Sequence, residues 1–354
     1  MDELPEELRS AIKGLEHSYK DFECHPGGAN GYVVFATNRV TAAEVAIKFY
    51  YGASGERRHD EPRLLASIES PNVLPILDAR HLSEEWAYFL TKRCGDGDLD
   101  QFITTRPSAR RAIDVALGIF TGVSSIHAHA LIHRDLKPAN VVLHEGVPLI
   151  ADFGSVRQIV EGESDIPASG HSALYRPPES FETGRYGLVG DVYQLGLVAY
   201  QLLGGALPYE PMDHFSARDF LEYKLVANDF ERSLYQDGVI HRKAVSATLI
   251  DMKSLPPWVK GNAKKVIRSM THPDVSQRIA NVADVAAALT QVRAETADWR
   301  WVDDIARLQM ADRVVELRPK RNGAYEPMQA KGDAFRRVPS MPDGLLRDLV
   351  DRFR

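Results

Sequence analysis

The length of 354 residues allows two or three compact units, and the 44% hydrophobic and 26% charged content is ordinary for a globular protein with a real core. The formal net charge of −6 argues against bulk binding of nucleic acid, which needs a strongly positive surface, so no nucleic-acid partner is expected. The sequence shows no signal-peptide pattern, no run of roughly 20 apolar residues and no cysteine framework, so we expect a cytoplasmic protein without a membrane partner.

The first part of the chain predicts a short polar helix and lead-in over 1–20, followed by a β-hairpin. Apolar residues alternate before and after a turn at Asn38, which is typical of two paired strands. Gly28 and Gly31 lie near the tip of this hairpin, where glycines let backbone amides approach phosphates. A plain β-turn is the alternative interpretation.

Helical and strand patterns alternate in the next part of the chain. Residues 61–68 have apolar positions at helical spacing, and Pro62 fits only the first turn of that helix. Residues 86–91 are predicted to form a strand, and residues 109–131 have the apolar spacing of a helix. The apolar stretch 189–203 predicts a buried helix.

Two neighbouring runs of residues predict a catalytic site. Residues 133–140 read H-R-D-L-K-P-A-N, and after a short apolar strand A-D-F-G follows at 151–154. The two runs supply the carboxylates of Asp135 and Asp152, the amide of Asn140 and the ammonium of Lys137. Carboxylate and amide oxygens suit Mg²⁺, and phosphoryl transfer depends on positioning and charge neutralisation. A polar loop whose Asp and Asn residues merely form turns is the competing interpretation.

The combined motif resembles that of the eukaryotic-type (Hanks-type) protein serine/threonine kinases. Four further motifs extend the resemblance over residues 26–280: V-A-I-K at 45–48, P-P-E at 177–179, the helix that starts near Asp191, and Arg278, expected to pair with Glu179.

The resemblance implies an α+β, bilobal protein-kinase fold, with a small, mostly β N-lobe containing one key helix and a larger, mostly α C-lobe. The corresponding boundaries are a lead-in at 1–20, the N-lobe at 21–91, the C-lobe at 92–295 with a hinge at 92–95, and a partly helical extension at 296–354.

The resemblance also assigns the catalytic roles. Asp135 would accept or orient the substrate hydroxyl, Lys137 would steady the transferring phosphoryl group, and Asn140 and Asp152 would bind Mg²⁺. Serine/threonine members of the family carry a lysine at the position of Lys137.

Three further positions complete the catalytic set that the resemblance implies. Lys48 would grip the ATP phosphates and pair with a helix glutamate, expected to be Glu61 with Glu56 as the alternative. Ser172 aligns with the hydroxyl that bridges to Asp135 and Lys137.

For ATP, the resemblance places the hinge against the adenine, with Thr91 at the back of the pocket and the backbone of Lys92 and Cys94 as its hydrogen-bonding edge. Pro26 stands where the family has the first glycine of its phosphate loop. The ATP-binding residues expected in this way are Gly28, Asn30, Gly31, Val33, Ala46, Lys48, Thr91, Lys92, Cys94 and Val142.

Two regions suggest regulation. Arg134 would pair with a phosphate on the activation segment 152–179, with Ser169 or Ser164 as the acceptor. In the extension, we expect an amphipathic helix within 299–314, an extended tail over 319–342, and a terminal helix near 345–350 that docks in cis or on a partner.

Three functions are compared. The first is an ATP- and Mg²⁺-dependent protein serine/threonine kinase that phosphorylates protein substrates and its own activation segment. The second is a pseudokinase-like scaffold, which the intact set of Lys48, Asp135, Asn140 and Asp152 disfavours. The third is a small-molecule phosphotransferase of the same fold, which Lys137 disfavours. The first interpretation is favoured, and Ala139 in place of the glutamate of many kinases that prefer basic peptides leaves the substrate sequence open.

Overall fold

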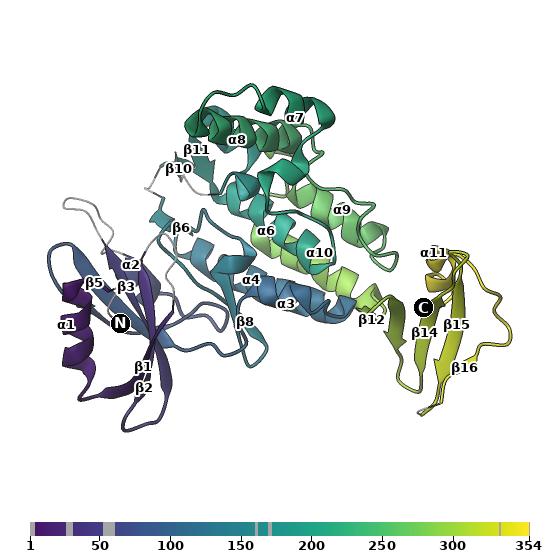
Figure 1. Cartoon of the computed structure of the whole chain (residues 1–354), viewed down its shortest axis with the longest axis horizontal. Coiled ribbons are helices and arrows are strands. Elements are labelled where there is room, and N and C mark those ends of the chain that lie inside the picture. The colour runs from purple at the N-terminus through teal and green to yellow at the C-terminus, as the bar shows by residue number, and fades with distance from the viewer. Residues whose placement is uncertain are drawn as a thin grey trace.

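The computed structural model describes residues 4–25, 31–51, 61–159, 162–168, 172–332 and 334–353, with the side chains of residues 61 and 64 left out. Three parts follow one another along the long axis of the molecule: a lobe built on a β-sheet, a helical lobe, and a second β-sheet at the opposite end (Figure 1).

The N-terminal lobe is an antiparallel sheet in the order β1-β2-β3-β5-β4, as far as the chain is described. Its elements are α1 (Glu6–Leu15), β1 (Tyr19–His25), β2 (Tyr32–Asn38), β3 (Glu44–Tyr51), α2 (Glu61–Ala66), β4 (Ile76–His81) and β5 (Trp86–Lys92).

Alternation along β3 separates the two faces of this sheet. Ile47 and Phe49 are buried on one face, where Leu8 and Ile12 of α1 pack against them, whereas Tyr50 belongs to a separate cluster. Since α1 contributes fully buried side chains to this core, the segment expected to be a polar lead-in is a structural part of the lobe.

Local signals in the N-terminal lobe produced the elements they predicted. β2 and β3 pair as the expected hairpin, and the Asn38 carboxamide oxygen accepts hydrogen bonds from the backbone N–H groups of Val40 (2.9 Å) and Thr41 (3.0 Å) in the turn. Pro62 is the second residue of α2, where its missing N–H leaves no helical bond unmade.

The helical lobe is built around α4 and α6. Ser108 caps the N-terminus of α4 by accepting from the backbone N–H of Arg111, and α6 is buried along most of its length, as its apolar run predicted. The helices are α3 (Leu99–Thr104), α4 (Ala109–Ala128), α5 (Pro178–Thr183), α6 (Leu188–Leu202), α7 (Ala217–Tyr223), α8 (Asp229–Val245), α9 (Gly261–Met270) and α10 (Val282–Glu295).

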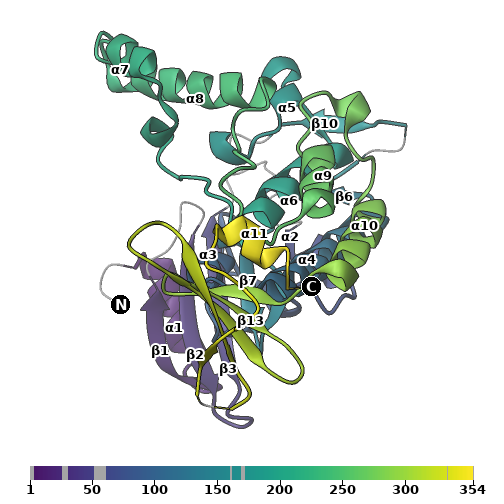
Figure 2. The same cartoon turned by 90° about the vertical axis from the view of Figure 1, so that its right-hand side faces the viewer.

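Short strand pairs shape the loops of this lobe. They are β6 (Leu131–Ile132) with β9 (Arg157–Gln158), β7 (Val141–His144) with β8 (Val147–Ile150), and β10 (Asp165–Pro167) with β11 (Arg185–Gly187). Figure 2 shows α7 and α8 extending from one corner of the lobe.

The C-terminal region corrects the prediction of an amphipathic helix over 299–314 and an extended tail over 319–342. It is a five-stranded antiparallel sheet in the described residues, followed by one short helix. Its elements are β12 (Trp299–Val302), β13 (Ile305–Gln309), β14 (Val314–Pro319), β15 (Tyr325–Ala330), β16 (Arg336–Arg337) and α11 (Leu346–Val350).

A tight turn explains why the helix prediction was wrong. Asp303 and Asp304 connect β12 to β13, and Asp303 adopts a left-handed φ of 53°, which reverses the chain. Ala306 and Leu308 then alternate into the core with the period of a strand, although Ile305 and Leu308 also fit helical spacing.

Aromatic stacking joins the C-terminal sheet to the helical lobe. Trp258, which precedes α9, lies parallel to Trp299 at 5.9 Å between ring centroids and tilted against Trp301 at 5.0 Å. The apolar side of α11 is buried beside this sheet, and Asp351 forms an ion pair with Lys260.

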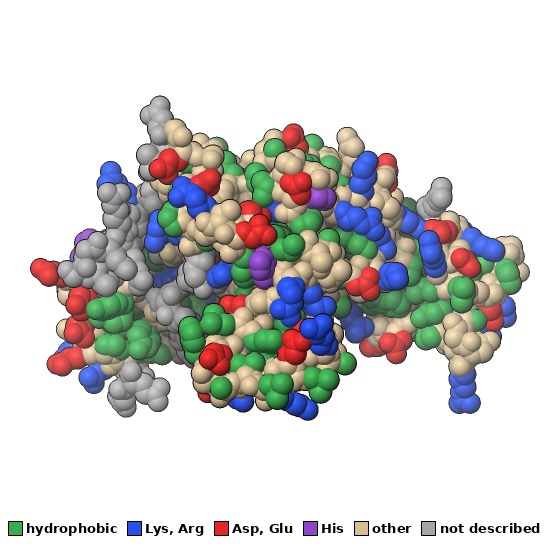
Figure 3. Space-filling view, turned by 90° about the horizontal axis from the view of Figure 1, so that it is seen from above, with side chains coloured by type: hydrophobic (Ala, Val, Ile, Leu, Met, Phe, Trp, Pro, Cys, Tyr) green, Lys and Arg blue, Asp and Glu red, His purple; other side chains and the backbone are tan. Residues whose placement is uncertain are grey.

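Acidic and basic side chains are interspersed on the face of the molecule shown in Figure 3. Among the helices that the structure describes, none has the length and hydrophobicity needed to cross a membrane.

Candidate active site

The residues predicted to hold phosphates and metal meet between the two lobes. Lys48 on β3 places its Nζ 2.6 Å from Oδ1 of Asp152, which follows β8. Burial alone would raise the pKa of the Asp152 carboxyl, but the charge and hydrogen bond of Lys48 hold this pKa below its ordinary value. Asp152 is therefore ionised at neutral pH, as a metal ligand must be.

The loop after β6 forms a tight polar cluster. Lys137 Nζ lies 2.9 Å from Oδ2 of Asp135, and Asn140 donates through Nδ2 to the Asp135 carbonyl (2.7 Å) and to the same Oδ2 (2.9 Å). Because Asn140 uses only its Nδ2 in these bonds, its Oδ1 can serve as a ligand. Asn140 and Asp152 thus offer two oxygen donors of the kind Mg²⁺ prefers, and the residues fit this ion.

Asp191 at the start of α6 holds this loop in place. Its fully buried carboxylate accepts hydrogen bonds from the backbone N–H groups of His133 and Arg134, both at 2.9 Å. His127 contacts the same carboxylate at 2.7 Å through Nε2, and the Tyr186 hydroxyl donates to it at 3.0 Å. The sequence marked the helix that starts near Asp191, whereas the partners His127 and Tyr186 were missed because they lie on other elements.

The residues expected around adenine are brought together by strand pairing. Ala46 pairs with Thr91 in the β3–β5 register, and Val33 pairs with Lys48 between β2 and β3. Thr91 is buried. Val142 on β7 forms an isolated bridge with Asp98, just beyond the expected hinge.

Gly31 is required where the expected phosphate loop enters β2. Its φ is +144°, and a Cβ at this position would lie 2.1 Å from the carbonyl oxygen of Phe49. Only glycine can approach the neighbouring strand this closely.

Several predicted residues are not placed by the structure. Gly28, Asn30 and Glu56 lie outside the described residues, and so does the side chain of Glu61. Ser172 is exposed, and no hydrogen bond joins it to Asp135 or Lys137 in the described structure, so its bridging role stays a prediction.

Arg134 contacts the backbone of the expected activation segment. Its Nε donates to the Ser155 carbonyl and one terminal nitrogen to the Pro167 carbonyl, both at 2.6 Å. Burial, and then the nearby charge of Arg157, lower the pKa of Arg134 to about 10. Ser164 is exposed beside Asp165, whereas Ser169 lies outside the described residues.

The expected ion pair behind this segment is present. Arg278 donates to both carboxylate oxygens of Glu179, at 2.7 and 2.8 Å, and its guanidinium lies 5.0 Å from the ring centre of Tyr193. A bidentate ion pair of this geometry fixes the orientation of α5 relative to the rest of the helical lobe.

A polar network beside the site could not be anticipated from the sequence. Tyr175 donates to Gln201 (2.8 Å) and contacts the Tyr209 hydroxyl (3.3 Å), while Tyr209 donates to Asp100 on α3 and accepts from Gln201 (3.1 Å). Burial, and then the hydrogen bond with Asp100, raise the pKa of Tyr209 to about 12. The network ties the segment before α5 to α3 and α6.

Comparison with known proteins agrees with this geometry. The family model described as protein kinase domain matches residues 27–291. The mitogen-activated protein kinase hog1 of Botryotinia fuckeliana is 30% identical over 267 residues, covering 72% of this chain and 72% of that protein. The mitogen-activated protein kinase mpkC of Aspergillus niger is 29% identical over 272 residues, covering 72% of this chain and 66% of that protein.

Proposed function

The chain belongs to the eukaryotic-type protein serine/threonine kinase family, and we propose that it is an active member that transfers the γ-phosphoryl group of ATP to protein hydroxyls with the help of Mg²⁺. The observation that carries this proposal is the intact cluster of Lys48, Asp135, Lys137, Asn140 and Asp152 between the two lobes.

Each residue of this cluster has a task in the proposed reaction. The substrate hydroxyl would donate its proton toward the carboxylate of Asp135, and Lys137, whose Nζ lies 2.9 Å from Oδ2 of that carboxylate, would neutralise charge on the transferring group. Asn140 and Asp152 would hold Mg²⁺, which neutralises charge on the phosphates, and Lys48 would contact those phosphates.

The cluster and the segment that Glu179 and Arg278 anchor argue against the two alternative functions. A scaffold without activity has no need of an ionised Asp152 beside Lys48. A small-molecule phosphotransferase has no need of the segment that Glu179 and Arg278 anchor, which in this family presents a peptide. We propose a cytoplasmic location for the protein, the one expected from its sequence.

Phosphorylation of the activation segment is part of the proposal. The buried Arg134 and the neighbouring Arg157 provide positive charge beside this segment, so a phosphate on Ser164 or Ser169 would find basic partners. Mass spectrometry of proteolytic peptides after incubation with ATP and Mg²⁺ locates such a phosphate.

Labelled ATP tests the activity directly. Incubation of the full chain with γ-labelled ATP, Mg²⁺ and a mixture of unstructured proteins is expected to give phosphoserine or phosphothreonine, and EDTA is expected to remove at least about 99% of the transfer because the phosphates lose their counter-charge. Transfer to a small-molecule hydroxyl but to no protein would contradict the proposal.

The hydrogen-bond network around Tyr209 predicts that its loss changes KM for the protein substrate but not KM for ATP. Tyr209→Phe removes the hydroxyl that joins Tyr175, Gln201 and Asp100, so the peptide-presenting segment loses support. We expect KM for a protein substrate to rise by about threefold to tenfold, the value of one or two hydrogen bonds, with KM for ATP unchanged. Tyr235→Phe, which loses the hydroxyl contacts to Glu222 (2.9 Å) and Asp219 (3.3 Å) near α7, is the control, and an equal rise in that variant would contradict this role.

A further inference from the structure

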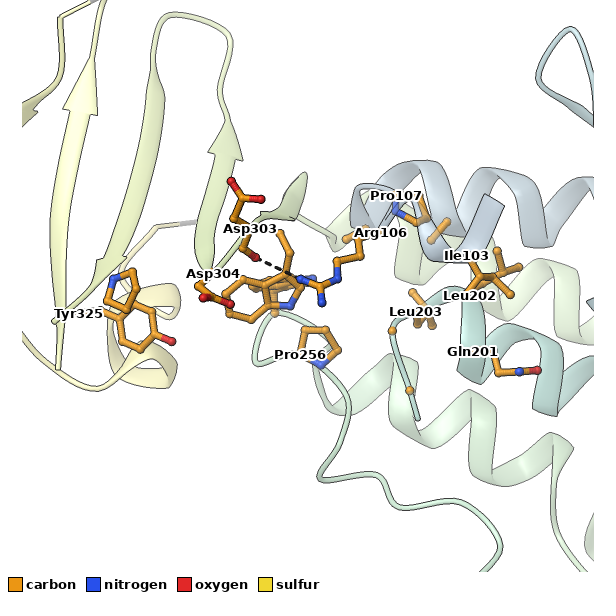
Figure 4. A pocket seen from close by; sticks show the side chains of 17 residues that line it. Ile103, Arg106, Pro107, Gln201, Leu202, Leu203, Pro256, Asp303, Asp304 and Tyr325 are labelled. Atoms are coloured by element: carbon orange, nitrogen blue, oxygen red, sulfur yellow. Dashed lines mark hydrogen bonds between the residues drawn. The ribbon is translucent and has the colours of Figure 1, made fainter. Parts of the chain in front are cut away.

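A cavity of about 580 Å³ lies where the helical lobe meets the C-terminal sheet, and none of the active-site residues lines it (Figure 4). Its volume lies within the roughly 300–1,000 Å³ typical of small-ligand sites. The residues that matter for its chemistry are Arg106, Trp258, Trp301, Asp303, Asp304 and Tyr325.

Three aromatic residues, Trp258, Trp301 and Tyr325, are among those that line the cavity. Trp258 is buried and contacts the rings of both Trp299 and Trp301, so its own ring is held rigidly. Tyr325 is fixed from the other side of the cavity because its backbone N–H and carbonyl both pair with Gly344, at 2.8 and 3.1 Å. Rigid aromatic faces attract cations through their negative ring faces and also bury apolar groups.

The two acidic residues of the β12–β13 turn have different orientations. Figure 4 shows the side chains of Asp304 and Tyr325 facing the same space, whereas the Asp303 carboxylate points away from it. The Asp303 carbonyl accepts a hydrogen bond from Arg106 at 3.2 Å, which holds that guanidinium. Within the described chain, no ion pair is formed by the Asp304 carboxylate.

We propose that this cavity binds an organic cation, with its guanidinium or ammonium group at Asp304 and its apolar body against Trp258, Trp301 and Tyr325. The carboxylate supplies the opposite charge, and the aromatic rings favour a weakly hydrated cation over a small inorganic one. An arginine-like group fits this chemistry whether it belongs to a free small molecule or to a side chain of a polypeptide.

The proposal is tested with the full chain by titration calorimetry and tryptophan fluorescence. The free-cation probe is N-acetyl-L-arginine amide, and N-acetyl-L-citrulline amide is its uncharged counterpart of nearly the same shape. We expect saturable binding of the arginine probe, tighter by about tenfold than binding of the citrulline probe. No saturable binding of any cation, or equal binding of both probes, would overturn the proposal.

Two variants in one turn localise the site. Asp304→Asn keeps the size of the side chain but removes its charge, so it is expected to weaken binding of the arginine probe by about fivefold or more. Asp303→Asn makes the same change one residue earlier, in a residue whose left-handed φ asparagine tolerates, and is expected to leave binding unchanged. Equal losses in the two variants, or no loss in Asp304→Asn, would show that the cation binds elsewhere.

A peptide separates the two sources of the cation. Acetyl-Ala-Ala-Ala-Arg-Ala-Ala-Ala-amide contains no phosphate acceptor, and an affinity about tenfold above that of the free probe would identify a polypeptide as the ligand. An affinity equal to or lower than that of the free probe would identify a small molecule. Because both arms are measured by binding, their outcome is independent of whether the chain transfers phosphate.

Discussion

Replacement of Asp152 by asparagine is expected to reduce phosphoryl transfer by at least about 10³-fold while the protein stays folded. The carboxylate lies 2.6 Å from Lys48 and is ionised, so of the two oxygen donors proposed for Mg²⁺ it is the one that carries a charge. Asparagine keeps the shape of the side chain and tolerates the left-handed φ of 54° at this position, which alanine would strain. The loss should therefore be one of charge alone.

The measurement is kcat for transfer from γ-labelled ATP to protein, with circular dichroism and thermal unfolding as checks of the fold. Asp343→Asn is the matched control, since Asp343 is also ion-paired, to Lys320 and Arg337, but lies beyond the C-terminal sheet. Retention of more than about a tenth of the transfer by Asp152→Asn would mean that no metal-dependent step runs through this carboxylate.

The catalytic-loop part of the candidate site was predictable because its residues are close together in the sequence. Asp135, Lys137 and Asn140 share one loop, so their mutual contacts follow from the motif itself. Lys48 and Asp152 are 104 residues apart, and only the resemblance to a known family could place them together.

Two other features of the molecule depend on interactions that could not be predicted from local sequence patterns. Tyr209 and Asp100 are 109 residues apart in the sequence, and no motif indicates that they form a hydrogen bond. The first two strands of the C-terminal sheet were predicted as a helix because Ile305 and Leu308 satisfy both periods, and the turn at Asp303 that decides between them uses no glycine or proline.

Asp191→Asn tests the scaffold beneath the catalytic loop. The native carboxylate accepts hydrogen bonds from two backbone N–H groups and contacts His127 and Tyr186. It is fully buried. Asparagine presents an NH₂ group where one oxygen accepted a hydrogen bond, so at least one buried donor loses its partner. We expect the free energy of unfolding to fall by about 3 kcal/mol and kcat to fall with it, because the loop that carries Asp135 loses its anchor.

Urea unfolding followed by circular dichroism measures this loss. Tyr186→Phe removes a single neutral donor from the same carboxylate and should cost only about 1 kcal/mol. A loss in Asp191→Asn no larger than that in Tyr186→Phe would show that the loop does not depend on this carboxylate.

The same variant carries a pH signature. Burial alone would raise the pKa of Asp191, but the hydrogen bond and charge of His127, followed by the charge of His133, hold it below the ordinary value of 3.8. A carboxyl with a depressed pKa in the folded state contributes stability that is complete above its unfolded pKa and is lost as the pH falls through its folded pKa. The stability difference between the native chain and Asp191→Asn should therefore be constant from neutral pH down to about pH 5 and shrink below about pH 4. A difference that shrank between pH 7 and pH 5 would show that the titration of Asp191 is not responsible for the pH dependence.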